Sequence, residues 1–271
     1  MNDKPVLREL SVGELLDKAF RLYRSHFLTL IGITALLTIP GMLLEILAAA
    51  LWQSIQVMNI LQNLIFGILM NAALITAISS FYLTQPATSI QQALRLGAKR
   101  YLSILGSSLL MGLAMAAPLI LILIFALARS IVLTLISYLG LLVFMVFLSN
   151  RWGLSHQAIL LEGKGAVDGL QRSWTLTQKY FWRVLGTSTA AGLIVSLVTS
   201  LPTFSLSALT RSLSIPLTQA LILNAVFSQL LAALITPFSV AVSVLIYYDL
   251  RIRAEAFDLE YAADSAFEKT S

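Results

Sequence analysis

Long apolar runs alternate along the chain with shorter segments in which charged residues gather. Six runs are long enough to cross about 30 Å of hydrocarbon as a helix that rises about 1.5 Å per residue. They cover residues 28 to 51, 60 to 83, 102 to 127, 131 to 149, 184 to 204 and 218 to 248. The pattern predicts an all-α, polytopic integral membrane protein with six transmembrane helices.

The segments that lead into the first, third and fifth runs share a pattern. Each has an aromatic residue five positions before a glycine, in FRLYRSHFLTLIG (20 to 32), LRLGAKRYLSILG (94 to 106) and WTLTQKYFWRVLG (174 to 186). Upstream of each, apolar residues recur at spacings of three or four with charges between them, as on one face of a helix. We expect three repeats of an interfacial amphipathic helix plus a transmembrane hairpin, at about 11–83, 89–149 and 165–248.

Two of these amphipathic helices have a recognisable start. Ser11 with Glu14, and Ser89 with Gln92, fit the capping box, in which the Ser side chain accepts a backbone N–H and the Glu or Gln reaches back. No Pro/Gly/Ser-rich linker separates the repeats. We therefore expect one membrane domain, 1–271, packed around a pseudo-threefold axis, with a cytoplasmic helix and tail at 249–271.

Composition and charge agree with a membrane location and orient the chain. Only 11% of residues are charged and 58% are hydrophobic, whereas soluble domains are near 25% charged. Sixteen of the eighteen Lys and Arg residues fall on one side of the predicted spans, and Arg129 and Arg211 are the other two. The positive-inside rule then places both termini in the cytoplasm.

The openings LSVGELLDKAFRLYRSHF and LQRSWTLTQKYFWRVLG, with the ending YYDLRIRAEAFDLE, resemble the bacterial glycerophosphoryl diester phosphodiesterase membrane domain family. The resemblance implies a six-helix module of the bacterial cytoplasmic (inner) membrane. A catalytic phosphodiesterase barrel needs about 250 residues of alternating strand and helix, which this chain lacks, so the resemblance supplies no catalytic residue. Ala256 stands where the family has a glycine, which argues against a sharp turn there.

The residues themselves offer little catalytic chemistry. The chain has no cysteine, and its two histidines, His26 and His156, have no partner at metal-ligand spacing. We therefore expect no enzyme, no metal and no cofactor. Nucleic acid is not an expected partner, because the basic residues follow the membrane face, where anionic lipid headgroups attract them at about 1 kcal/mol per charge.

Two groups of residues are candidates for an interfacial or partner-binding surface. In YYDLRIRAEAFDLE (247 to 260), Asp249 with Arg253 and Arg251 with Glu255 have the i,i+4 spacing of helix ion pairs. The last helix either continues into the cytoplasm and docks on the interfacial helices, or it presents a partner-binding patch. The segment 165 to 183 is expected to lie in the membrane plane on Val167, Leu170, Trp174 and Phe181. The candidates are Trp174, Lys179, Arg183, Tyr248, Asp249, Arg251 and Arg253.

Inside the membrane, small and polar residues recur every fourth position. Stripes through Gly112 and Gly192 should let helix backbones approach closely. Asn63 and Asn71 are expected to face Asn224 and Ser228, either as packing contacts or as a polar path. Two functions remain: a non-enzymatic module organising lipid or partner proteins at the cytoplasmic face, or a transporter or lipid-handling channel using these Asn and Ser residues.

Overall fold

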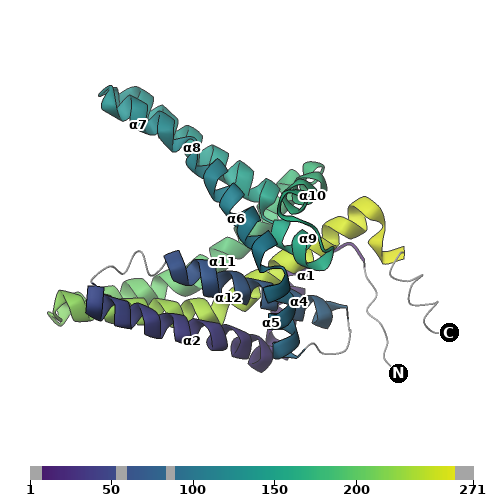
Figure 1. Cartoon of the computed structure of the whole chain (residues 1–271), viewed down its shortest axis with the longest axis horizontal. Coiled ribbons are helices and arrows are strands. Elements are labelled where there is room, and N and C mark those ends of the chain that lie inside the picture. Colours follow the sequence, from purple (N-terminus) through teal and green to yellow (C-terminus); the bar gives the residue numbers. More distant parts are fainter. Residues whose placement is uncertain (1–7, 53–59, 84–88, 260–271) are drawn as a thin grey trace. The chain divides into compact units, whose positions relative to one another are not determined.

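The computed structural model describes residues 8–52, 60–83 and 89–259, which form helices joined by short turns (Figure 1). Within these ranges there is no strand, and six helices are long and apolar enough to cross a membrane. They are Phe27–Leu44, Ile60–Tyr82, Tyr101–Leu127, Ile131–Leu161, Phe181–Ser212 and Gln219–Glu255. The protein is an all-α, polytopic membrane protein, which confirms the predicted fold class.

The chain divides into two compact units. Unit 1 comprises Met1–Lys99 and Gly186–Ser271, and unit 2 comprises Arg100–Leu185. These boundaries cut through the second and third repeats, and the predicted single domain with a pseudo-threefold axis stays a prediction. Unit 1 holds α1 (Val12–Ser25), α2 (Phe27–Trp52), the π-helix η1 (Asn63–Gly67), α4 (Ile68–Tyr82), α5 (Ile90–Lys99), most of α11 (Phe181–Ser212) and α12 (Leu217–Glu255). Unit 2 holds the start of α11 together with α6 (Tyr101–Ala116), α7 (Leu119–Leu127), α8 (Ile131–Trp152), α9 (Ser155–Leu161) and α10 (Ala166–Gln178).

An amphipathic helix directly precedes a spanning helix three times, as α1 before α2, α5 before α6 and α10 before α11. The second and third pack on the hairpin before them: α5 on α4, and α10 on α8 and α9. The first has no earlier hairpin, and it packs on α12, the last helix of the chain. The amphipathic helices α5 and α10 therefore pack with the hairpin that precedes them, and α1 packs with the last helix of the chain.

Close helix contacts explain why the amphipathic helices dock on protein rather than lie free. Leu15 and Ala19 of α1 are buried. A Cβ added to Gly97 of α5 would come within 2.9 Å of the Ala72 Cβ of α4, and one added to Gly169 of α10 within 2.5 Å of Ile159 Cγ1 of α9. Both glycines allow an approach that a larger residue would block.

The start of α1 and the turn before α5 follow the predicted capping boxes. Ser11 Oγ accepts a hydrogen bond from the Glu14 N–H at 3.3 Å, and the Ser11 N–H donates to Glu14 Oε2 at 2.8 Å. Ser89 and Gln92 repeat the arrangement at 3.2 and 3.1 Å. These local bonds satisfy backbone donors that the first turn of a helix cannot pair.

The last helix ends in a left-handed turn that the sequence argued against. Ala256 has φ 52° and ψ 41°, and its N–H donates to the Ile252 carbonyl. The expectation that the missing glycine removes a sharp turn here is wrong, because the backbone turns with alanine in a conformation that glycine adopts at lower cost.

The glycines of the two small-residue stripes are not points of close helix contact within the described chain. A Cβ added to Gly112 of α6 or Gly192 of α11 would meet no atom within 4 Å. The predicted close approach is therefore absent at these two glycines, whereas Ser108 of the α6 stripe lies 3.1 Å from His156 of α9. Close approach occurs instead at Gly97 and Gly169, where the amphipathic helices dock.

Candidate functional site

An ionic cluster with a buried carboxylate joins the N-terminal segment to the end of α12 in unit 1. Asp249, only 2% exposed, accepts hydrogen bonds from the Leu10 N–H at 2.9 Å and from Arg253 Nε at 3.0 Å. Arg253 also donates to Glu9 Oε2 at 2.6 Å and to the Leu10 carbonyl at 3.1 Å. We call Glu9, Leu10, Asp249 and Arg253 the α1–α12 clamp. It confirms that the last helix continues past the apolar run and docks on the first amphipathic helix.

Aromatic side chains extend the clamp toward α4. Tyr248 is buried, its hydroxyl lies 2.6 Å from Ser79 Oγ, and its ring lies 5.2 Å from that of Tyr82. Arg251 lies over the Phe257 ring at 3.9 Å and pairs with Glu255 at 3.4 Å. Burial of Tyr248 and Asp249 means that these two residues do not form an exposed partner surface; they hold unit 1 together.

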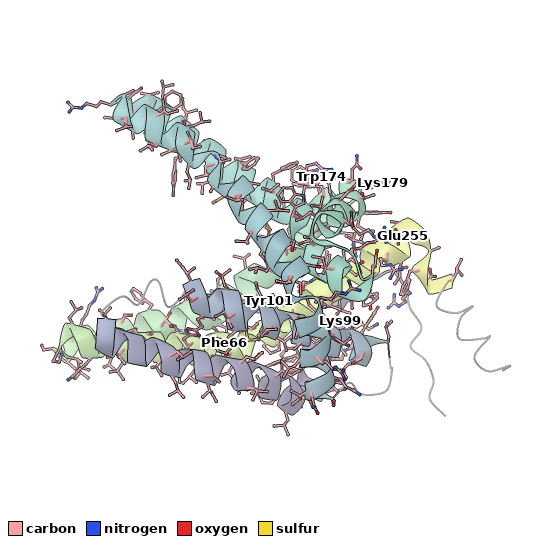
Figure 2. All side chains as sticks on the ribbon, viewed as in Figure 1. Phe66, Lys99, Tyr101, Trp174, Lys179 and Glu255 are labelled. Carbon is pink, nitrogen blue, oxygen red and sulfur yellow. The ribbon has the colours of Figure 1, made fainter. Side chains whose placement is uncertain are left out.

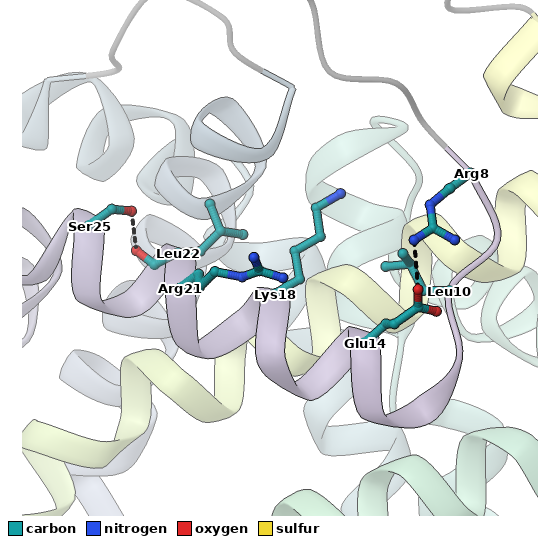
Figure 3. Close-up of a pocket in the computed structure, with 7 residues that line it drawn as sticks. All are labelled: Arg8, Leu10, Glu14, Lys18, Arg21, Leu22 and Ser25. Atoms are coloured by element: carbon teal, nitrogen blue, oxygen red, sulfur yellow. Dashed lines mark hydrogen bonds and ion pairs between the residues drawn. The ribbon is translucent and has the colours of Figure 1, made fainter.

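A basic pocket opens beside the clamp along α1 (Figure 3). Its volume is about 470 Å³, and its lining is Arg8, Leu10, Glu14, Lys18, Arg21, Leu22 and Ser25. The Lys18 ammonium lies 4.5 Å from the centre of the Tyr82 ring. Burial, followed by repulsion from Arg8 and Arg21, lowers the pKa of Lys18. Two positively charged neighbours, Arg8 and Arg21, therefore lie near a half-buried ammonium.

The other cations of the pocket have carboxylate partners on α1. Arg8 Nη2 donates to Glu14 Oε1 at 2.6 Å, and Arg21 Nη2 donates to Asp17 Oδ2 at 2.5 Å (Figure 3 draws the first pair). The Ser11 N–H and Arg8 lower the pKa of Glu14 to about 2. Glu14 is therefore ionised at neutral pH and offsets part of the positive charge.

Unit 2 has a second basic feature, the guanidinium of Arg151 at the end of α8. It lies 5.4 Å from the centre of the Phe147 ring, 5.1 Å from Trp174 and 5.1 Å from Phe181, within the range of cation–π attraction. Its Nε and Nη1 are enclosed and have no hydrogen-bond acceptor among the described residues. Ser173 Oγ donates to the Arg151 carbonyl at 2.7 Å, which ties α10 to the end of α8.

The apolar face of the third amphipathic helix, α10, packs partly on the protein and is partly exposed. Leu170 is 6% exposed within unit 2, and Trp174 packs on Phe147 and Arg151, whereas Val167 is 64% exposed. Lys179 at the end of α10 is exposed and Arg183 on α11 is half-buried; Figure 2 labels Trp174 and Lys179. The prediction that the segment 165–183 lies in the membrane plane did not include the packing of α10 on α8 and α9.

Asn224 has its hydrogen-bond partners on α11 and on its own helix. It accepts a hydrogen bond from Ser207 of α11 at 2.7 Å and donates to the Ala220 carbonyl of α12 at 2.8 Å. Neither of these bonds goes to Asn71, and the expectation that Asn63 and Asn71 face Asn224 and Ser228 stays a prediction. Ser228 donates to the Ala225 carbonyl within α12, and Asn63 begins the π-helix η1.

Sequence reasoning missed both Lys18 and Arg151. It counted them only as charges on one membrane face. The signal that could have found Lys18 is its place between Leu15 and Leu22 on the apolar side of α1, and for Arg151 the aromatic residue four positions earlier. Among the described residues, no group of three or more His, Asp or Glu lies close enough to hold a metal ion.

Comparison with known proteins gives a family but no activity. A family model described as a domain of unknown function (DUF7847) matches residues 10–250. No curated protein and no solved structure matches the chain. The resemblance to the glycerophosphoryl diester phosphodiesterase membrane domain stays a prediction, because nothing in the family match refers to it.

Proposed function

We propose that this chain, which belongs to the DUF7847 family of unknown function, is a non-enzymatic membrane module that organises anionic lipids or a partner protein at the charged end of its spanning helices. By the charged end we mean the end at which α1, α5 and α10 join α2, α6 and α11. The proposal includes a bacterial inner membrane location with this end and both termini in the cytoplasm.

The observation that carries the proposal is the basic pocket on α1. It is concave, it runs along α1 as far as Ser25, close to the start of the first spanning helix, and three of its seven lining residues are cations. Anionic lipid headgroups occupy the same level of a membrane, and they attract basic residues at its surface. The clamp supports the proposal because it holds α1 in one position on α12, so that the pocket is preformed.

A transporter or lipid-handling channel is the alternative, and the polar residues of the spans weigh against it. Many Ser and Thr hydroxyls there donate to carbonyls of their own helix, as Thr199 does to Val195, Thr203 to Thr199 and Ser228 to Ala225. Such bonds satisfy the hydroxyls internally, so these groups need no water-filled path.

The proposal is tested by extracting the protein in polymer discs directly from a bacterial membrane and quantifying the lipids. We expect phosphatidylglycerol and cardiolipin to be enriched over discs cut from the same membrane at random. Unchanged lipid composition, with no protein partner captured by cross-linking at the charged end, would contradict the module. Flux of a solute or lipid in proteoliposomes, lost on Asn224→Ala, would favour the alternative.

A further inference from the structure

The pocket on α1 has a volume within the range of small-molecule sites, and most of its lining residues are charged or polar. Ligand pockets generally enclose about 300–1,000 Å³, and this one has about 470 Å³. Figure 3 shows Lys18 extending from the middle of α1, separate from the Arg8–Glu14 pair. Arg8 and Lys18 therefore bring a guanidinium and an ammonium to separate places in the lining of the pocket.

The charges in the pocket leave an unbalanced cation. Arg8 and Glu14 neutralise each other, and Arg21 pairs with Asp17. Lys18 has no carboxylate partner among the described residues, and its contact is the face of the Tyr82 ring. An ammonium has three donors, and a ring face leaves donors on its outer side for an anion.

The position of the pocket selects anions at the membrane surface. Its lining runs from Arg8 to Ser25, and α2 begins its apolar span at Phe27. The helix breaks between them at His26, which has φ −118° and ψ 27°. One end of the pocket therefore meets the level at which the spanning helix enters hydrocarbon, and Leu22 lies at that end beside Ser25.

We propose that this pocket binds a phosphate group, with Lys18 as its anchor and Arg8 and Arg21 as the flanking cations. The inference rests on the proposed function, which implies that the phosphate belongs to an anionic lipid headgroup whose acyl chains continue along Leu22 toward α2. Charge-assisted hydrogen bonds from Lys and Arg are the usual contacts of a protein-bound phosphate. A free inorganic phosphate would make the same contacts, so it is the alternative source of the bound phosphate group.

The test measures binding to the full chain in a non-ionic detergent at constant ionic strength. The probes are dioctanoyl phosphatidylglycerol, dioctanoyl phosphatidylcholine (whose choline offsets the phosphate charge) and inorganic phosphate. We expect phosphatidylglycerol to bind and phosphatidylcholine not to. Inorganic phosphate that binds as tightly as phosphatidylglycerol would retain the phosphate site but overturn the lipid as its source.

Three variants of α1 separate the pocket from general electrostatic attraction. Lys18→Gln should weaken phosphatidylglycerol binding about tenfold, the loss expected for one charge-assisted hydrogen bond. Arg24→Gln removes the same charge from an exposed position outside the pocket and should change binding less than about twofold. Glu14→Gln should tighten binding severalfold, because it releases Arg8 while glutamine retains the capping box.

If Lys18→Gln and Arg24→Gln weaken phosphatidylglycerol binding equally, the proposed phosphate site is overturned. Weaker binding of phosphatidylglycerol to Glu14→Gln would overturn it as well. Because the latter variant adds no bulk and removes no apolar contact, it keeps the test valid even if Lys18→Gln fails to fold. A further outcome separates the two proposals. If Lys18→Gln and Arg24→Gln bind dioctanoyl phosphatidylglycerol equally, but anionic lipid remains enriched in polymer discs of Lys18→Gln, the phosphate site fails and the proposed function stands.

Discussion

The α1–α12 clamp should contribute far more stability than an ion pair of the same spacing at the surface. Asp249→Asn retains a carbonyl oxygen for the Leu10 N–H but places an amide where Arg253 Nε needs an acceptor. Losing a hydrogen bond to a charged group costs about 1.5–3 kcal/mol. Removing one partner of a fully buried pair costs about 3–5 kcal/mol, but Arg253 retains Glu9 and the Leu10 carbonyl as acceptors.

We therefore expect Asp249→Asn to lower the free energy of unfolding by about 2 kcal/mol, within the range for one charged hydrogen bond and below the buried-pair range. The matched control is Asp17→Asn, which breaks the Asp17–Arg21 pair, also i,i+4, with side chains 60% and 72% exposed against 2% and 18% in the clamp. Exposed pairs contribute about 0–1 kcal/mol, so the control should be nearly neutral.

The assay is thermal unfolding of the purified variants in one detergent at neutral pH. A loss of about 2 kcal/mol corresponds to roughly 4–8 °C in Tm for a unit of this size. The double variant Asp249→Asn/Arg253→Gln should lose less than the sum of the single variants, because each removes the same bond. Equal shifts for Asp249→Asn and Asp17→Asn would refute the claim that burial makes the clamp a stabilising contact.

Three further predictions concern topology, the end of α12 and the membrane interior. In this cysteine-free chain, Ser130→Cys should react with an impermeant thiol reagent from outside intact cells and Gly13→Cys, in the exposed first turn of α1, should not; the reverse pattern would invert the topology. Ala256→Gly should raise Tm, since relief of about 1–2 kcal/mol of left-handed strain exceeds the about 0.4–1 kcal/mol of added chain entropy; a lower Tm would show that the alanine is unstrained. Ser207→Ala and Asn224→Ala should show a coupling energy of about 0.6–1.7 kcal/mol in a double-mutant cycle of detergent stability, and strictly additive losses would contradict the hydrogen bond between α11 and α12.

Features set by neighbouring residues could be predicted from the sequence. Each apolar run became a spanning helix, because a bilayer requires every backbone group to be paired within the segment. The capping boxes at Ser11 and Ser89 formed because both partners lie within one turn. The continuation of the last helix through Asp249 and Arg253 followed from their i,i+4 spacing.

Contacts between distant residues could not be predicted in the same way. Periodicity shows that Leu15 and Ala19 of α1 share one face, but it contains no information on which helix covers that face. The pairing of Asn224 with Ser207 depends on how α11 and α12 align, which composition does not determine. The basic pocket and the aromatic rings around Arg151 likewise arise only after helices dock.

The docking of α1 on α12 has a consequence for biosynthesis. Leu10 and Asp249 are separated by 239 residues, so a ribosome working at about 5–20 residues per second completes α12 about 12–48 s after it has made α1. During that interval α12 is not available to cover Leu15 and Ala19, and an amphipathic helix with an uncovered apolar face lies in the headgroup region with that face down. The amphipathic pattern of α1 thus has two roles: it binds the nascent chain to the membrane surface during synthesis, and it packs on α12 in the folded protein.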